Sequence, residues 1–492
     1  MGRLIEHRQY CAQDYENFTK RIHDQVDTLK EVISQPDFGK DQETKIGAEL
    51  ELYLIDESSN VSPVNLQLLE KLNDPQFVAE VNQYNLELNL SPYPAAGKPF
   101  TQLKREILNK FGTLWDVAAQ LKTRPLATGI LPTLEERHLT SEYMTKEPRY
   151  QVLARELRKL RGSPFHIKFD GDEPIDFKTA EICVEGANTS FQVHLMVDKD
   201  KFASTFNAAQ LTLPMALGIS ANSSVLFGKT VWDETRVSLF KQSMDTRICD
   251  TRPWREPARV NYGQGWVRDG AWELFAEAVN IYQPLFPELF EVEDSSGLPE
   301  LAELNLHMGT IWPWNRPIYC NDGNGHLRIE FRALPSGPTA IDMAANSAFM
   351  IGMAVGLEHK VDEYMPRIPF RFSEYNFYNA ARKGLDATIL WPQNYQHKPT
   401  EVPIRNIIDQ MLQVSYDGLT TLGVDEEERE KYIRVIQHRL HMDITPAKWQ
   451  RLTYQHFQRK MNKRNACREM LNLYFKNQMH GHPITEWETI WK

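Results

Sequence analysis

The stretch HLRIEFRALPSGPT, which runs from His326 to Thr339, decides how the rest of the chain is interpreted. Side chains alternate between the two faces of a strand, so Arg328, Glu330 and Arg332 are expected to share one face. Three charged groups in a row are costly to bury without partners. The row suits a site where a carboxylate holds a metal ion and guanidinium groups hold an anion beside it. Mg²⁺ and a nucleotide phosphate are the obvious pair.

Three earlier stretches alternate apolar and polar residues in the same way, at residues 45–55, 84–90 and 189–197. They predict three further strands. Apolar residues at three- and four-residue spacing predict helices at residues 15–35, 103–121 and 202–217, and from residue 341 onward the pattern is mainly helical. Strands interrupted by single helices and followed by a helical tail favour an α+β fold over a βαβ repeat.

Each predicted strand carries polar groups on one face, and the earlier three contribute Glu49, Glu51, Glu87, Gln192 and His194, with Glu80 just ahead of the second strand. Ordinary explanations exist for each: a solvent-facing Glu-x-Glu, a structural histidine, or a cross-strand ladder of ion pairs for the Arg-Glu-Arg row. These ordinary explanations would all have to be true at once, while the residues on the opposite faces of the strands stay apolar. We therefore favour one shared site, in which a hard divalent cation compensates the paired carboxylates.

The composition of the chain limits the classes of protein to which it can belong. With 41% hydrophobic and 25% charged residues, the chain of 492 residues is typical of soluble globular proteins, and its net charge of -10 argues against nucleic acid as the main partner. Its cysteines show no CxxC pair and no regular spacing, so they support neither a zinc site nor a disulfide framework: Cys11, Cys183, Cys249, Cys320 and Cys467. The first eight residues lack the apolar core of a leader, and no apolar run is long enough to span a bilayer. We expect a cytoplasmic protein.

Several short motifs occur in a characteristic order: GAELE at residues 47–51, the spacing from Glu80 to Glu87 ahead of LNLSP, QVH at residues 192–194, and HLRIEFR at residues 326–332. PRY at residues 148–150 and the pair Thr235-Arg236 add to the series. The chain thus resembles the type 2 glutamate–cysteine ligase family of carboxylate–amine ligases, which is related in fold to glutamine synthetase. The resemblance runs from about residue 45 to about residue 390.

The resemblance implies a fold and a set of site residues. We expect an antiparallel sheet forming a glutamine synthetase-like catalytic cleft flanked by helices, with a catalytic domain at residues 1–390 and a helical extension at residues 391–492 packed on it. ATP and Mg²⁺ or Mn²⁺ are the expected cofactors, and the residues that match metal ligands are Glu49, Glu51, Glu80, Glu87, His194 and Glu330. Glu330 and Arg332 are expected to be catalytic, Arg332 and Arg328 to bind ATP, and Arg236, Gln192 and Arg149 to bind substrate.

The activity implied is an ATP-dependent ligation that forms a γ-glutamyl amide through an acyl phosphate, most simply from glutamate and cysteine, as in glutathione biosynthesis. Its partners would be small-molecule substrates, with neither nucleic acid nor membrane, and a homo-oligomer is left open. One departure concerns the substrate: residues 129–132 read GILP, where the family commonly has Gly-x-His-Pro. Three alternatives therefore stay open: the same chemistry on another amine or carboxylate, a catalytically reduced binding or regulatory homologue, and a phosphagen kinase-like phosphotransferase.

Overall fold

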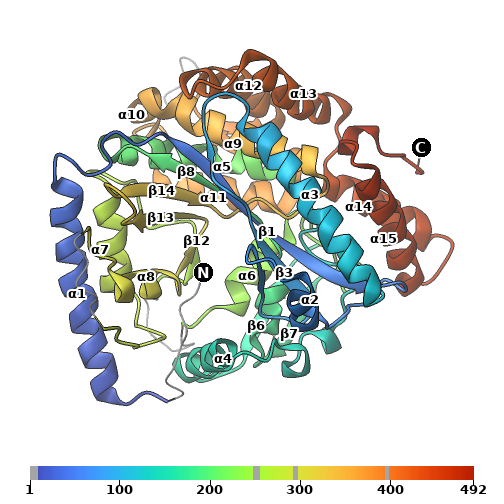
Figure 1. The fold of residues 1–492 in the computed structure, drawn as a ribbon. Helices are drawn as coiled ribbons and strands as arrows, with labels where there is room; N and C mark the ends of the chain where they lie inside the picture. Colours follow the sequence, from blue (N-terminus) through green and yellow to red (C-terminus); the bar gives the residue numbers. More distant parts are fainter. Residues whose placement is uncertain (1–8, 248–254, 292–296, 394–397, 492) are drawn as a thin grey trace.

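The computed structural model describes residues 9–247, 255–291, 297–393 and 398–491. Its main element is an eight-stranded antiparallel sheet with the path β13-β14-β8-β1-β3-β2, to which β4 and β5 are added at β1 (Figure 1). The bounds are β1 Lys45–Asp56, β2 Phe77–Ala79, β3 Asn85–Asn89, β4 Tyr93–Pro94, β5 Thr123–Leu126, β8 Phe191–Val197, β13 Asn315–Cys320 and β14 His326–Phe331. The four predicted strands are β1, β3, β8 and β14, and the predicted antiparallel α+β fold is confirmed.

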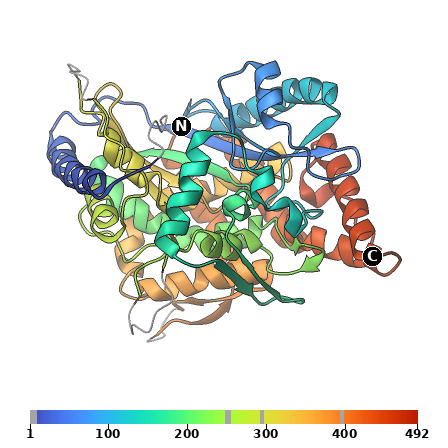
Figure 2. The same ribbon diagram turned by 90° about the horizontal axis from the view of Figure 1, so that it is seen from below.

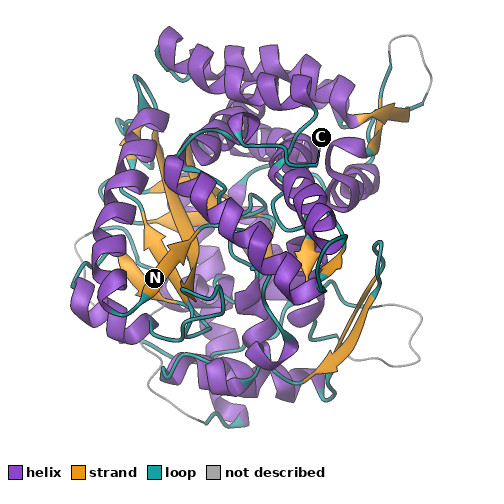
Figure 3. Ribbon diagram, turned by 90° about the vertical axis from the view of Figure 1, so that its right-hand side faces the viewer, coloured by secondary structure: helices purple, strands orange, loops and turns teal. Residues whose placement is uncertain are grey.

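One face of this sheet is apolar and is covered by helices. Leu50, Val193 and Ile329 are fully buried on that face. Helix α9 (Ala340–Leu357) contacts β8, α5 (Phe202–Ser220) contacts β13, and α3 (Pro99–Gln120) contacts β1. Figure 3 shows the strands of the sheet flanked by helices. Helices on one face leave the polar side chains together on the other, as the alternation of the strands requires.

The remaining helices lie around this core. Helix α1 (Ala12–Ser34) packs on α7 (Ala271–Ile281) and α8 (Ala302–Met308), on the opposite side of the molecule from the C-terminal helices α14 and α15 (Figures 1 and 2). The other helices are α2 Asn65–Leu72, α4 Pro148–Arg161, α6 Thr235–Ser243, α10 Val361–Tyr364, α11 Phe370–Lys383, α12 Ile404–Thr421, α13 Glu426–Met442, α14 Pro446–Gln458 and α15 Lys463–His480. The predicted helices at residues 15–35, 103–121 and 202–217 are thus confirmed as α1, α3 and α5.

Four small two-stranded sheets complete the fold, and their strands are β6 Phe165–Phe169 with β7 Ile175–Thr179, β9 Val225–Leu226 with β10 Lys229–Thr230, β11 Val260–Asn261 with β12 Trp312–Pro313, and β15 Thr388–Trp391 with β16 Thr400–Pro403. The last pair interrupts the helical tail that the sequence predicted. Of the cysteines, Cys11, Cys183, Cys320 and Cys467 are free, while Cys249 and the first eight residues lie outside the described part of the chain.

Among the described residues, Ala340–Tyr364 is a helical stretch long and apolar enough to cross a membrane, and 83% of its most apolar window is buried inside the protein. It contains α9, which packs against α3, α5, α12 and α13. Contact with helices on several sides accounts for its apolar composition, since a helix that is hydrophobic all round belongs in a core.

Helix α12 docks on α9 through glycines. A Cβ added at Gly418 would lie 2.0 Å from the carbonyl oxygen of Gly352 and 2.5 Å from the backbone nitrogen of Gly356. Real Cβ atoms do not approach backbone so closely, so the two helices can cross at this distance only with glycine at the contact. The C-terminal helices are thereby held against the helix that supports the sheet.

We expect Gly418→Ala to lower the free energy of unfolding by about 2 kcal/mol or more, because the added methyl group would push the two backbones apart. Urea denaturation measures this change. Gly112→Ala in α3 is the matched control, because a Cβ there meets nothing within 4 Å and alanine favours the helix by about 1 kcal/mol over glycine. Equal stability of the two variants would show that the crossing adjusts freely.

Candidate active site on the polar face of the sheet

The strand register brings the predicted polar residues side by side. Glu330 of β14 lies opposite His194 of β8, and Glu49 of β1 lies opposite Gln192 of β8. On the other side of β1, Glu51 is paired with Glu87 of β3. These residues therefore occupy one continuous patch that crosses four neighbouring strands.

Glu49, His194 and Glu330 form the tightest group in this patch. Their ligand atoms all lie within 4.8 Å of one another. The Nε2 atom of His194 is 3.1 Å from Oε1 of Glu49 and 4.0 Å from Oε1 of Glu330. Burial opposes ionisation of Glu49, but the hydrogen bond and charge of His194 outweigh it and lower the pKa of this carboxyl. An ionised carboxylate and an imidazole at this spacing fit a divalent metal ion.

Glu330 is held between two arginines. Its side chain is 1% exposed, and Arg316 of β13 donates from Nε to Oε2 and from Nη2 to Oε1, the latter at 3.0 Å. Arg332 donates from Nη1 to Oε1 of Glu330 at 3.0 Å and also to Oε1 of Gln192. Although burial works against the charge, the two guanidinium groups lower the pKa of Glu330 far below its usual range. Glu330 is therefore a fixed negative charge.

A second group of carboxylates is formed by Glu51 of β1, Glu87 of β3 and Glu80, which follows β2. The backbone N–H of Ser190 donates to Oε2 of Glu51 at 2.6 Å, and Nε2 of Gln192 donates to Oε1 at 3.1 Å. Burial and the charges of Glu49 and Glu51 raise the pKa of Glu87 to about 8. Burial and neighbouring carboxylates raise the pKa of Glu80 well above its ordinary value. Carboxyls that repel one another in this way would be stabilised by a nearby cation.

Two residues that the sequence reasoning missed belong to this face, Arg316 and Glu185. Arg316 lies opposite Glu330 in the β13–β14 pair, and the alternation along residues 315–320 was the signal that could have found it. Glu185 lies in the 3-10 helix Ile182–Ala187 ahead of β8. Burial and the charge of Glu51 raise its pKa to about 8, and its Oε2 atom is buried without a hydrogen-bond partner. No strand pattern surrounds Glu185, so periodicity could not reveal it.

Glu185→Gln is expected to stabilise the protein at pH 8 but not at pH 4.5. The pKa of this carboxyl rises from 4.5 to about 8 on folding, so the folded protein keeps a proton that the unfolded chain releases, and stability is lost as pH rises through this window. Because the Glu185 side chain is partly exposed, solvent screening reduces this effect, and we expect Glu185→Gln to raise the free energy of unfolding at pH 8 by about 1–2 kcal/mol. Urea denaturation at both pH values without divalent metal measures it, with exposed Glu142→Gln as control. A gain that is equal at both pH values would contradict the assignment.

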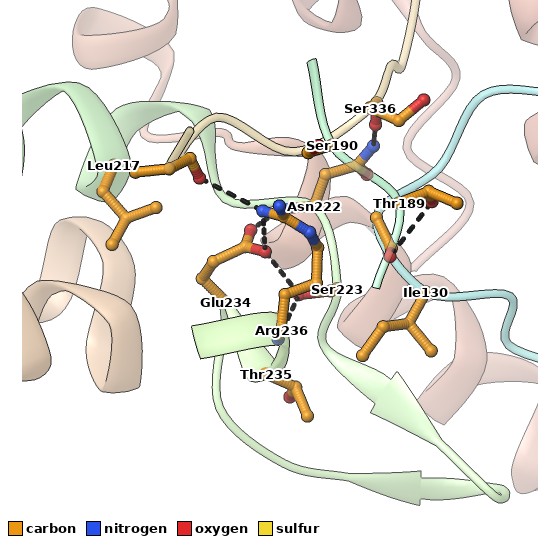
Figure 4. Close-up of polar contacts among 12 residues, drawn as sticks. Ile130, Thr189, Ser190, Leu217, Asn222, Ser223, Glu234, Thr235, Arg236 and Ser336 are labelled. Atoms are coloured by element: carbon orange, nitrogen blue, oxygen red, sulfur yellow. Dashed lines mark hydrogen bonds and ion pairs between the residues drawn. The ribbon is translucent and has the colours of Figure 1, made fainter. Parts of the chain in front are cut away.

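The predicted substrate-binding arginines lie at two edges of the face. Arg236 is 2% exposed and donates from Nη1 to Oε1 of Glu234 and to the carbonyl oxygen of Ala333, both at 3.1 Å (Figure 4). Its charge also acts on the Glu51 carboxyl. Arg149, at the start of α4, donates to the carbonyl oxygen of Ala79 at 2.8 Å and pairs with Glu147 at 3.0 Å. Both arginines lie beside the second group of carboxylates rather than beside Glu330.

The Glu234–Arg236 pair is part of a buried network. The backbone N–H of Asn222 and the hydroxyl of Ser223 both donate to Glu234 at 2.9 Å (Figure 4). A Cβ at Gly129 would lie 3.0 Å from Cδ of Arg236. The GILP segment, which departs from the family pattern, therefore packs directly against a predicted substrate-binding residue.

Two further residues of this region are Arg328, which lies on β14, and Trp314, which immediately precedes β13. Arg328 is opposite Ile318 of β13 and Met196 of β8, two positions along β14 from Glu330. Its Nε atom is buried without a hydrogen-bond partner. Trp314 is 1% exposed and packs on the rings of Phe240 and Phe377. Trp314 is therefore a core residue.

The antiparallel sheet flanked by helices and followed by a mainly helical C-terminal part has the fold class of glutamate–cysteine ligase-like proteins. Residues 45–273, just under half of the chain, match the sequence model of the glutamate–cysteine ligase family 2, which confirms the resemblance over that range. The range includes Glu49, Glu51, Glu87 and His194, while Glu330 and the arginines of β13 and β14 lie beyond it. The family match supports an ATP-dependent ligase.

A solved structure supports the assignment of the fold. A glutamate–cysteine ligase from Francisella tularensis in complex with AMP superposes with a TM-score of 0.50 at 10% identity, over 89% of this chain and 90% of that chain. A bifunctional glutathione synthetase from Pasteurella multocida gives a TM-score of 0.48 at 11% identity, over 93% of this chain and 55% of that chain. None of the curated proteins matches the chain. At such identities the first likeness shows the fold alone.

Proposed function

We propose that the protein is an ATP-dependent carboxylate–amine ligase that forms a γ-glutamyl amide, most simply γ-glutamylcysteine from glutamate and cysteine. The observation that supports this proposal best is the convergence of Glu49, His194 and Glu330 within 4.8 Å, with Arg332 bonded to Glu330 at 3.0 Å. A metal-binding group and a fixed guanidinium on one face are what phosphoryl transfer from ATP needs.

The residues of this face fit Mg²⁺ or Mn²⁺. Two carboxylates and an imidazole form the proposed site, and the neighbouring carboxylates Glu51, Glu87 and Glu80 would add further oxygen ligands. When bound, the ion would offset negative charge on the β- and γ-phosphates. Gln192 would orient the site, because its amide nitrogen holds Glu51 and its amide oxygen accepts from Arg332.

The proposed reaction has two steps. First, a carboxylate oxygen of glutamate attacks the γ-phosphorus of ATP, and the bond to the β-γ bridging oxygen breaks to release ADP. Arg332 would stabilise the charge on the transferred phosphoryl group, with Arg328 further along the strand near the same nucleotide. The amine nitrogen then attacks the acyl phosphate, the carbon–oxygen bond to phosphate breaks, and the nitrogen loses a proton. Arg236 and Arg149 would bind the substrate carboxylates as forked donors.

A different amine or acid is the second candidate, and one observation favours it. Leu131 is fully buried and stands where the family commonly has histidine, in the segment that packs against Arg236 through Gly129. An apolar side chain at this position lacks the hydrogen-bond donor and acceptor of a histidine imidazole. A substrate site beside Arg236 without an imidazole would discriminate differently among polar substrates.

The proposal is tested by measuring ADP release from ATP and Mg²⁺ with glutamate and a panel of amines that includes cysteine. ADP release that needs both glutamate and cysteine supports glutamate–cysteine ligation. Release with another amine or acid alone supports the second candidate. Nucleotide binding without any turnover would favour a catalytically reduced homologue, and no nucleotide binding would overturn both ligase proposals.

We also propose that residues 1–390 are the catalytic part and residues 391–492 an extension packed on it. All candidate site residues lie between Glu49 and Arg332, which supports this division. The contacts across it include Tyr474 of α15, whose hydroxyl donates to the carbonyl oxygen of Ala127 at 2.9 Å. The extension would then support the loops behind the site without contributing groups to it.

A further inference from the structure

Arg316 is the one guanidinium among the described residues that engages both oxygens of Glu330. It donates from Nε to Oε2 and from Nη2 to Oε1, a two-pronged pairing that fixes the plane of the carboxylate. Arg332 reaches Oε1 alone. Three of the hydrogen bonds that Glu330 can accept are therefore taken by arginines, where a carboxylate has room for about four.

The same carboxylate belongs to the proposed metal site, because Oε1 of Glu330 also lies 4.0 Å from Nε2 of His194. A cation bound there would share Glu330 with a second positive charge. Arg316 is 15% exposed and Glu330 1% exposed, so water screens this repulsion only weakly. A carboxylate that already accepts charged hydrogen bonds on both oxygens also has less charge to offer a metal ion.

We infer that Arg316 competes with the metal ion for Glu330 and so sets how tightly the site holds that ion. This inference rests on the proposed function. Its consequence is that an anion able to take over the Arg316 fork, such as a nucleotide phosphate, would free Glu330 for the ion. Metal and nucleotide would then strengthen each other's binding.

The test is Mn²⁺ binding without nucleotide, measured from the EPR signal of free Mn²⁺. Arg316→Gln removes the competing charge and is expected to lower the Mn²⁺ dissociation constant by about tenfold. Arg316→Lys keeps the charge but loses the fork, so its affinity should fall between those of the wild type and the glutamine variant. Arg268→Gln, at an exposed arginine paired with Glu273 outside the site, should leave Mn²⁺ binding unchanged.

A parallel titration of Glu330→Gln separates this inference from the function on which it rests. If Glu330→Gln leaves Mn²⁺ affinity unchanged, the metal site itself is wrong. If Glu330→Gln weakens binding while Arg316→Gln weakens it too or has no effect, the metal site stands and the competition is refuted. Circular dichroism checks that each variant folds. If Arg316→Gln does not fold, Arg316→Lys decides the matter: Mn²⁺ binding no tighter than that of the wild type overturns the inference.

Discussion

Replacing Glu330 by glutamine is expected to lower ligase turnover by on the order of 10³-fold, because it removes one of the three groups proposed to hold the metal ion. Glutamine is preferable to alanine here. Both changes remove the counter-ion of Arg316 and Arg332, but alanine also removes every acceptor oxygen, at a cost to folding of about 3–5 kcal/mol, so a loss of activity could reflect unfolding, whereas glutamine keeps the side-chain volume and one acceptor. Glu330→Ala should still abolish turnover.

The measurement is ADP release under saturating ATP and Mg²⁺, with thermal unfolding recorded for each variant. Glu428 offers a matched control, since it is 2% exposed and accepts hydrogen bonds from Thr101 at 2.7 Å outside the site. Glu428→Gln should lower stability but preserve turnover in the folded protein. Near-normal turnover of Glu330→Gln would show that Glu330 does not hold a catalytic metal ion.

Arg332→Lys is the substitution with the second largest expected effect, a loss of turnover of about 100-fold. Arg332 bridges Glu330 and Gln192 from Nη1, which leaves the rest of its guanidinium fork for a phosphate. Lysine keeps the positive charge but cannot reproduce the fork, so binding of ATP should weaken less than the rate of phosphoryl transfer.

Single-turnover kinetics with ATP and glutamate separates nucleotide binding from the chemical step. Arg439→Lys is the control, because Arg439 is a fully buried arginine paired with Asp342 at 2.9 Å and lies among C-terminal helices. That variant should lose stability while its folded fraction keeps its rate. If Arg332→Lys has only a mild effect on the rate, the phosphate role belongs to another residue, with Arg328 and Arg316 the next to vary.

The sequence predicted the strands of the site well because alternation is a local property. β1, β3, β8 and β14 each carry their polar residues two positions apart, so Glu49, Glu51, Gln192, His194, Glu330 and Arg332 could be assigned to one face before any register was known. Their roles as ligands and phosphate groups stay predictions. That Glu49 contacts His194 and that Glu51 is paired with Glu87 depends on strand order and register, which alternation does not encode.

Other parts of the site depend on contacts between distant segments. Arg316 reaches Glu330 only because β13 pairs with β14, and Glu185 lies in a short 3-10 helix without periodicity. The buried state of Arg236 follows from Glu234, Asn222 and Ser223, which a linear pattern shows only as neighbouring polar residues. The β15–β16 hairpin was also missed, because its strands are only four residues each.

The glycine contact between α9 and α12 has a consequence for how the chain unfolds. Gly352 and Gly356 on one helix meet Gly418 on the other with no room for a side chain, and α9 also packs against the sheet through β8. Removing residues 391–492 would therefore expose the side of α9 that packs on α12 and α13. A calorimetric scan should show a single cooperative transition, and residues 1–390 expressed alone should behave as a partly melted protein rather than an independent domain.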